Sequence, residues 1–192
     1  MLWIFQIRFS SDNFPSLLGH KLAVTFGQTF WRRVVLDHNW FDLLLASLNS
    51  VSVHVRFCWL RTVVGGWTTS LRMHEIHPLP CIFGCLDCVD NLEHYMLCPI
   101  LWNISCEIYS GEDSLVLEER LCLRNPTIIK LARLAITCDI YHTVKNDSLS
   151  CSPPCVAEPL FVQTRACEFA KALKERYRSV SNSVNQLRSS VI

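Results

Sequence analysis

Four cysteines and one histidine fall within the eighteen residues from Cys81 to Cys98. Thiolates and imidazoles are the preferred ligands of Zn²⁺, and a structural zinc site holds its ion with four of them. The five groups are Cys81, Cys85, Cys88, His94 and Cys98. Their order and spacing suit one tetrahedral zinc site better than a disulfide pattern. We therefore expect zinc as the cofactor of this stretch.

Five groups compete for four positions, and two choices of the first pair are open. Cys85 and Cys88 have the usual short spacing of a zinc knuckle, with two residues between them. Alternatively, Cys81 and Cys85 form the pair, with three residues between them, and Cys88 is a bystander. His94 and Cys98 serve in both arrangements. The competing interpretation without a metal is that the thiols are ordinary buried core residues.

A turn and a short helix must position these ligands. Gly84 allows the backbone to fold around an ion, because glycine adopts conformations that other residues avoid. Asp90 or Asn91 can cap a helix that begins after them. His94 and Cys98 are four residues apart, so both project from one helix face toward the same point.

This stretch resembles the cysteine-rich zinc-binding module that follows the polymerase domain in non-LTR (LINE-type) retrotransposon reverse transcriptases. That module has a cysteine pair, a spacer with an acidic residue shortly before a histidine, and then a cysteine-proline and an aromatic residue. The matching residues here are Cys85, Asp90, His94, Cys98-Pro99 and Trp102. On this alignment the ligands are Cys81, Cys85, His94 and Cys98. The chain departs from the family pattern in the wider first pair and in the extra cysteine at position 88.

The catalytic centre of a polymerase is missing from the sequence. A reverse transcriptase holds two metal ions on paired aspartates, and no two aspartates are adjacent in this chain. There is also no glycine-rich phosphate loop and no supported nucleophile arrangement. At least four good donors indicate a closed, structural zinc site rather than an open catalytic one. We therefore expect a protein that is not an enzyme and has no small-molecule substrate.

The resemblance implies a non-catalytic tail of a retroelement reverse transcriptase, truncated from a polymerase domain upstream, that assists binding of template RNA or target DNA. Residues upstream combine positive charge with an aromatic ring, which could neutralise a backbone and stack bases. They are Arg56, Arg61, Trp67 and Arg72. Two rival hypotheses are a zinc-stabilised protein-interaction module and a retroelement remnant without a present function.

Charge is distributed unevenly, although the net charge is only +1. Residues 81–123 contain eight acidic side chains and one basic side chain, so the zinc stretch is a poor phosphate site. Basic side chains outnumber acidic ones in residues 1–80 and 159–192. Contacts with RNA or DNA are therefore expected from the flanks.

The patterning predicts a mainly α fold, in which helices flank a small zinc knuckle made of a turn and a short helix. Alternating apolar residues over 51–59 predict a short half-buried strand, although the resemblance allows a helix there. Helices are predicted after Asn39, from Asn125-Pro126 and, long and amphipathic, from Pro159 onward. The expected divisions are an N-terminal segment (1–58), the zinc module with packed helices (59–146), a linker (147–158) and the C-terminal helix (159–192).

Eleven cysteines, an odd number without a secretory signal, predict an intracellular, reducing compartment, either nucleus or cytoplasm. No window reaches the roughly 18 apolar residues of a membrane helix.

The single histidines His20, His38 and His54 are expected to be structural or solvated. Cys151 and Cys155 are spaced like a ligand pair, but no second pair lies nearby.

Overall fold

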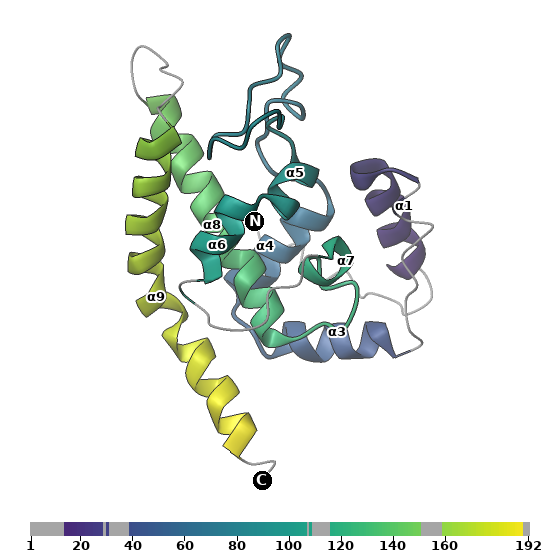
Figure 1. The fold of residues 1–192 in the computed structure, drawn as a ribbon. Coiled ribbons are helices and arrows are strands. Elements are labelled where there is room, and N and C mark those ends of the chain that lie inside the picture. The colour runs from purple at the N-terminus through teal and green to yellow at the C-terminus, as the bar shows by residue number, and fades with distance from the viewer. Residues whose placement is uncertain are drawn as a thin grey trace.

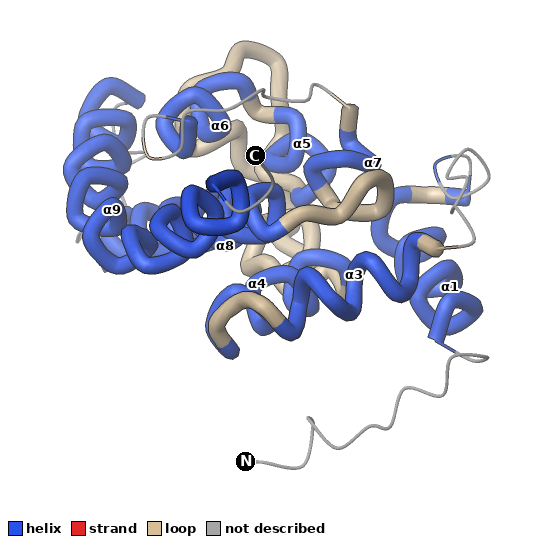
Figure 2. The backbone as a smooth tube through the Cα atoms, turned by 90° about the horizontal axis from the view of Figure 1, so that it is seen from below, coloured by secondary structure: helices blue, strands red, loops and turns tan. Residues whose placement is uncertain are grey.

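The computed structural model describes residues 14–28, 30, 39–106, 108, 116–150 and 159–189. Within these residues the chain forms helices joined by loops (Figures 1 and 2), which confirms the prediction of a mainly α fold. The β pairing in this part of the chain is one isolated antiparallel bridge between Pro80 and Val89. None of the described helices is both long enough and apolar enough to cross a membrane.

The helices pack around α8, which lies at the centre of the molecule (Figure 1). In chain order they are α1 (Phe14–Phe26), α3 (Trp40–Asn49), α4 (Val53–Val63), α5 (Leu92–Leu97), α6 (Pro99–Cys106), α7 (Leu117–Arg120), α8 (Ile128–Ser150) and α9 (Pro159–Ser189). α4, α6 and α9 all contact α8. The long loop between α4 and α5 projects from the top of the molecule in the view of Figure 1.

A helix, α4, occupies the positions for which a strand was predicted. The Ser52 hydroxyl accepts a hydrogen bond from the Val55 N–H at 3.4 Å and caps the helix. The buried side chains recur with helical spacing, at Val55, Cys58, Trp59, Thr62 and Val63, whereas Val53 and Phe57 are exposed. The strand prediction is wrong because the alternation over 51–59 overlapped a helical stripe that continues beyond it.

α8 begins two residues later than predicted. The Thr127 hydroxyl accepts a hydrogen bond from the Lys130 N–H at 3.2 Å, so Thr127 caps the helix rather than Asn125. α8 then runs to Ser150, and residues 151–158 lie outside the described part of the chain.

One hydrophobic core extends across the expected divisions of the chain. The boundary at residue 58 falls inside α4, and the interval 147–158 begins inside α8. The buried core runs without interruption from residues of α1 to residues of α9. The zinc stretch is thus packed into the same core as the elements on either side of it.

α9 docks lengthwise on α8, as its apolar pattern predicted. Its buried side chains recur every three or four residues and form one stripe. They are Val162, Ala166, Ala170, Leu173 and Tyr177. The apolar residues at 180, 184 and 187 continue this spacing in the sequence, and their side chains lie outside those that the structure describes.

A buried ion pair attaches the end of the projecting loop to α8. Lys145 Nζ lies 2.7 Å from Asp90 Oδ2, and both side chains are almost fully buried. Asp90 also accepts hydrogen bonds from the Ser70 N–H at 2.7 Å and from the Tyr141 hydroxyl at 3.3 Å. Because both carboxylate oxygens are satisfied, the desolvation of this charge is offset and the loop is held in place.

Substituting Lys145→Met should leave the Asp90 carboxylate buried without its cation. We expect the free energy of unfolding to fall by about 3–5 kcal/mol, measured by urea unfolding followed by circular dichroism. The exposed Lys171 of α9 provides the matched control, and Lys171→Met should change stability by less than about 0.5 kcal/mol. Equal stabilities of the two variants would contradict this role of the ion pair.

Candidate metal centre

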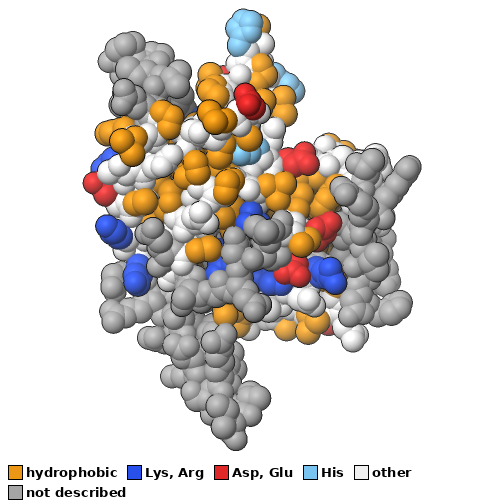
Figure 3. Space-filling model, in the orientation of Figure 1, with side chains coloured by type: hydrophobic (Ala, Val, Ile, Leu, Met, Phe, Trp, Pro, Cys, Tyr) orange, Lys and Arg blue, Asp and Glu red, His pale blue; other side chains and the backbone are white. Residues whose placement is uncertain are grey.

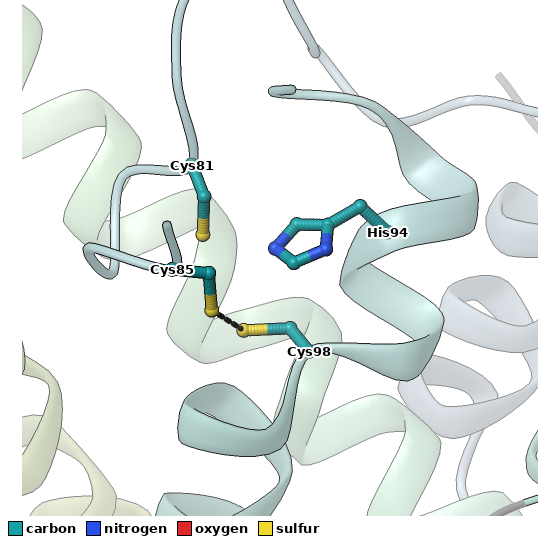
Figure 4. A group of neighbouring side chains, drawn as sticks. All are labelled: Cys81, Cys85, His94 and Cys98. Carbon is teal, nitrogen blue, oxygen red and sulfur yellow. Dashed lines mark hydrogen bonds between the residues drawn. The ribbon is translucent and has the colours of Figure 1, made fainter. Parts of the chain in front are cut away.

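Four of the five predicted ligands converge on one point. The ligand atoms of Cys81, Cys85, His94 and Cys98 all lie within 4.8 Å of one another (Figure 4). Cys85 Sγ and Cys98 Sγ are 3.5 Å apart. Tetrahedral zinc with Zn–S bonds of about 2.3 Å separates two sulfur ligands by about 3.8 Å. The separation of these two sulfur atoms is thus close to that around a tetrahedral ion, and the group could hold a metal ion.

Cys88, the fifth predicted ligand, lies outside this group. Its backbone carbonyl accepts a hydrogen bond from the Cys81 N–H at 2.8 Å, next to the bridge between Pro80 and Val89. Cys88 thus joins the two arms of the loop through its main chain. Of the two first pairs considered, the geometry brings together Cys81 and Cys85.

The turn that presents the first two thiols depends on Gly84. Its φ of +85° lies in the left-handed region, and its N–H donates to the Cys81 carbonyl at 3.0 Å. A Cβ at this position would collide with Pro159, the first residue of α9. In addition, the Gln163 side-chain amide donates to the Phe83 carbonyl at 2.7 Å. The start of α9 therefore packs directly on the turn that carries Cys81 and Cys85.

The second two ligands come from α5 and the residue that follows it. The Asn91 side chain accepts a hydrogen bond from the His94 N–H at 2.7 Å, so Asn91 is the cap of α5. α5 ends at Leu97, and Cys98 is its C-cap. Pro99 then begins α6, where a proline fits because the first turn of a helix needs no hydrogen bond from its N–H.

Two side chains satisfy the carbonyl groups that the end of α5 leaves free. The Trp102 indole N–H donates to the Tyr95 carbonyl at 3.0 Å, and Arg120 Nη1 donates to the Met96 carbonyl at 2.9 Å. The Arg120 guanidinium also lies 4.3 Å from the centroid of the Trp102 ring. These contacts support the short helix that carries His94.

The His94 ring points toward the three sulfur atoms in Figure 4. Its Nε2 atom is buried and has no hydrogen-bond partner within the described residues. A buried polar atom without a partner costs about 1–3 kcal/mol. A metal ion bound among the thiols would supply the missing partner, so the donor set fits such an ion.

The three thiols hold their protons unequally. The pKa of Cys81 is lowered to about 4, mainly because its sulfur is hydrogen-bonded by the Cys98 thiol. Burial acts in the opposite direction and raises this pKa. The pKa of Cys98 is raised by Cys81 and by burial, and burial raises the pKa of Cys85. A bound divalent cation would lower the pKa of all three thiols and so stabilise thiolates at all three positions.

Trp67 is in no position to stack on a base, contrary to the sequence-based expectation. It is fully buried, its ring stacks on Tyr141 with centroids 4.8 Å apart, and its indole N–H donates to the Thr62 hydroxyl at 2.9 Å. Apolar burial, rather than binding, explains this aromatic residue.

The three arginines predicted to bind nucleic acid all donate to backbone carbonyls of their own chain. Arg56 donates to the Asn49 carbonyl at the end of α3 and to the Val51 carbonyl in the loop after it, at 3.2 Å each. Arg61 and Arg72 both bond to the Gly66 carbonyl, at 2.9 and 3.4 Å. Because Arg61 and Arg72 share this acceptor, their side chains are neighbours. Arg72 is also exposed to solvent.

A second group of possible ligands was missed by the sequence-based reasoning. His54 and Cys58 of α4 and Asp139 of α8 place their ligand atoms within 4.8 Å of one another. The signal was present, because His54 and Cys58 are four residues apart, like His94 and Cys98. His54 was instead expected to be structural or solvated.

Comparison with protein-family models, with curated proteins and with solved structures found no match for this chain. The kinship with retroelement reverse transcriptases therefore stays a prediction from the sequence.

Substituting Asn91→Ala should weaken the metal centre by removing the cap beneath His94. We expect the free energy of unfolding to fall by about 1 kcal/mol, measured by urea unfolding, and metal affinity to fall with it. Asn91→Asp keeps an acceptor at the same position and should stay within a few tenths of a kcal/mol of the unsubstituted chain. Indistinguishable Ala and Asp variants would show that the cap does not support the site.

Proposed function

We propose that Cys81, Cys85, His94 and Cys98 bind one zinc ion with a structural role. The observation that carries this proposal is the convergence of three thiols and one unpartnered, buried imidazole nitrogen on one point. Three thiolates and a neutral imidazole complete a tetrahedral shell. No position is left for a water molecule or a substrate, so the ion is not catalytic.

The proposed ion joins elements that are distant in the sequence. Its ligands come from the Gly84 turn and from α5, and the turn in turn packs against the start of α9. Because metal binding to such a site is coupled to folding, much of the binding free energy becomes folding free energy. Zinc thereby stabilises the surface that the whole module presents to a partner.

Replacing Cys98→Ser should reduce zinc affinity and lower the melting temperature, since it removes a buried thiolate ligand. Cys88→Ser is the matched control and should retain both properties, because its thiol lies outside the group. Zinc content is measured by elemental analysis of purified protein, and melting by circular dichroism. Loss of this zinc from Cys88→Ser but not from Cys98→Ser would contradict the proposed ligand set.

For the module as a whole, we propose a non-catalytic role in holding RNA or DNA, as the resemblance to a reverse transcriptase tail implies. The flank that supports this role contains Arg61 and Arg72, at the end of α4 and in the projecting loop. The acidic stretch over 81–123 disfavours phosphate contacts elsewhere on the zinc segment. Cationic side chains on one flank would position a strand without reading its sequence.

Fluorescence anisotropy with a labelled single-stranded RNA tests this role. We expect affinity to fall as salt rises, and Arg72→Gln to weaken binding and reduce the salt slope by about 0.7 for the lost phosphate contact. Lys171→Gln changes the charge equally on α9 and should leave the slope unchanged. No binding at low salt, up to concentrations on the order of 100 µM, would contradict the proposal.

A protein partner is the second function that a specific observation favours. The projecting loop between α4 and α5 carries large apolar side chains in contact with solvent, and hydrophobic groups gather on it at the top of Figure 3. They are Leu71, Met73, Ile76, Leu86 and Val89. Contiguous exposed apolar surface is typical of interaction sites. If RNA and DNA do not bind, a protein-interaction module is the function this loop supports.

A further inference from the structure

A second set of metal-ligating side chains lies between α4 and α8 and shares no residue with the zinc centre. His54 Nε2 is 2.9 Å from Asp139 Oδ2 and 3.0 Å from Oδ1. Cys58 Sγ lies 3.5 Å from His54 Nε2 and 3.8 Å from Asp139 Oδ1. One nitrogen, one sulfur and one carboxylate thus face a common point.

These separations match those of ligands around a tetrahedral ion. With Zn–N and Zn–O bonds of about 2.0 Å and a Zn–S bond of about 2.3 Å, the N–S and S–O separations are about 3.5 Å and the N–O separation about 3.3 Å. Taken to Asp139 Oδ1 as the oxygen ligand, the three observed distances of 3.0, 3.5 and 3.8 Å differ from these values by only a few tenths of an ångström. A bound ion would require little rearrangement of the side chains.

The arrangement does not fit a cysteine nucleophile with a histidine base. Such a site divides the two ring nitrogens, one facing the thiol and the other facing the acid that orients the ring. Here the same atom, His54 Nε2, contacts both Cys58 and Asp139. Convergence on one nitrogen is instead what a shared metal ion requires.

The surroundings hold two ligands rigidly and leave the third accessible. Cys58 is buried in the core, and the Asp139 side chain is only 14 % exposed. The Tyr177 hydroxyl of α9 donates a hydrogen bond to Asp139 Oδ2 at 2.9 Å, as outer-shell groups do for metal-binding carboxylates. The His54 side chain is 46 % exposed, so solvent can reach the site and provide a fourth ligand.

We propose that His54, Cys58 and Asp139 bind one divalent transition-metal ion of the zinc type, with solvent completing the coordination. The mixed nitrogen, sulfur and oxygen donors favour Zn²⁺ or Co²⁺ over Ca²⁺ and Mg²⁺, which prefer oxygen ligands. With three protein ligands and one exchangeable position, this site differs from the closed shell at Cys98. It does not depend on the proposed zinc centre, because no ligand is common to both.

Cobalt titration of the full chain, stripped of metal under reducing conditions, tests this proposal. We expect the unsubstituted chain to take up two equivalents of Co²⁺, one for each group of ligands. His54→Gln should take up one equivalent and keep the strong sulfur-to-cobalt charge-transfer bands of the three-cysteine centre. The matched control is His20→Gln, an exposed histidine on α1, which should still take up two.

A second variant keeps the test decisive if the first alters the helix. Asp139→Asn preserves the size of the side chain and an acceptor for Tyr177, but removes the carboxylate ligand, and should also take up one equivalent. Equal cobalt uptake by His54→Gln, Asp139→Asn and His20→Gln would overturn the proposal and leave an ion pair only. Cys98→Ser separates the two sites, since it should lose the three-cysteine spectrum and retain the weaker one-sulfur bands.

Discussion

The structure depends on holding one turn and one short helix together against two long helices. The ligand atoms of Cys81 and Cys85 lie close to those of His94 and Cys98 only if the Gly84 turn is fixed relative to α5. The turn is held from outside by the start of α9, and the residue before the α5 cap, Asp90, is held by Lys145 of α8. The buried ion pair and the part-buried hydrogen bond from Gln163 to the Phe83 carbonyl thus hold the turn and α5 in their relative positions.

Two histidine-cysteine pairs with the same spacing occupy different environments. At α5 and its C-cap the pair lies beside two further thiols, and the buried His94 Nε2 atom has no hydrogen-bond partner among the described residues. In α4 the pair meets a single carboxylate and stays partly open to solvent. The first environment could satisfy an ion completely with protein ligands, whereas the second would leave one coordination position to solvent. The same local sequence spacing thus occurs in two groups that would hold an ion in different ways.

α9 contributes to both groups of ligands through opposite parts of its length. Near its start, Pro159 and Gln163 pack on the turn that carries Cys81 and Cys85. Further along, Tyr177 bonds to Asp139. Because α9 is docked on α8 by a continuous apolar stripe, any change in its docking reaches both sites. The polar contacts of Gln163 and Tyr177 and the apolar packing between them thus involve one continuous part of the helix.

The sequence by itself determined the helical class, limited the cap of α5 to Asp90 or Asn91 and predicted that His94 and Cys98 face one point, because these follow from spacing and capping within a few residues. It did not decide between Cys81 and Cys88, which differ only in how the loop pairs with itself, nor show that Trp67 is buried. It also gave His54 no role, because Asp139 comes from a helix eighty-five residues away. Only the tertiary structure decided these points, since packing, not local pattern, chooses which distant side chains meet and which remain in water.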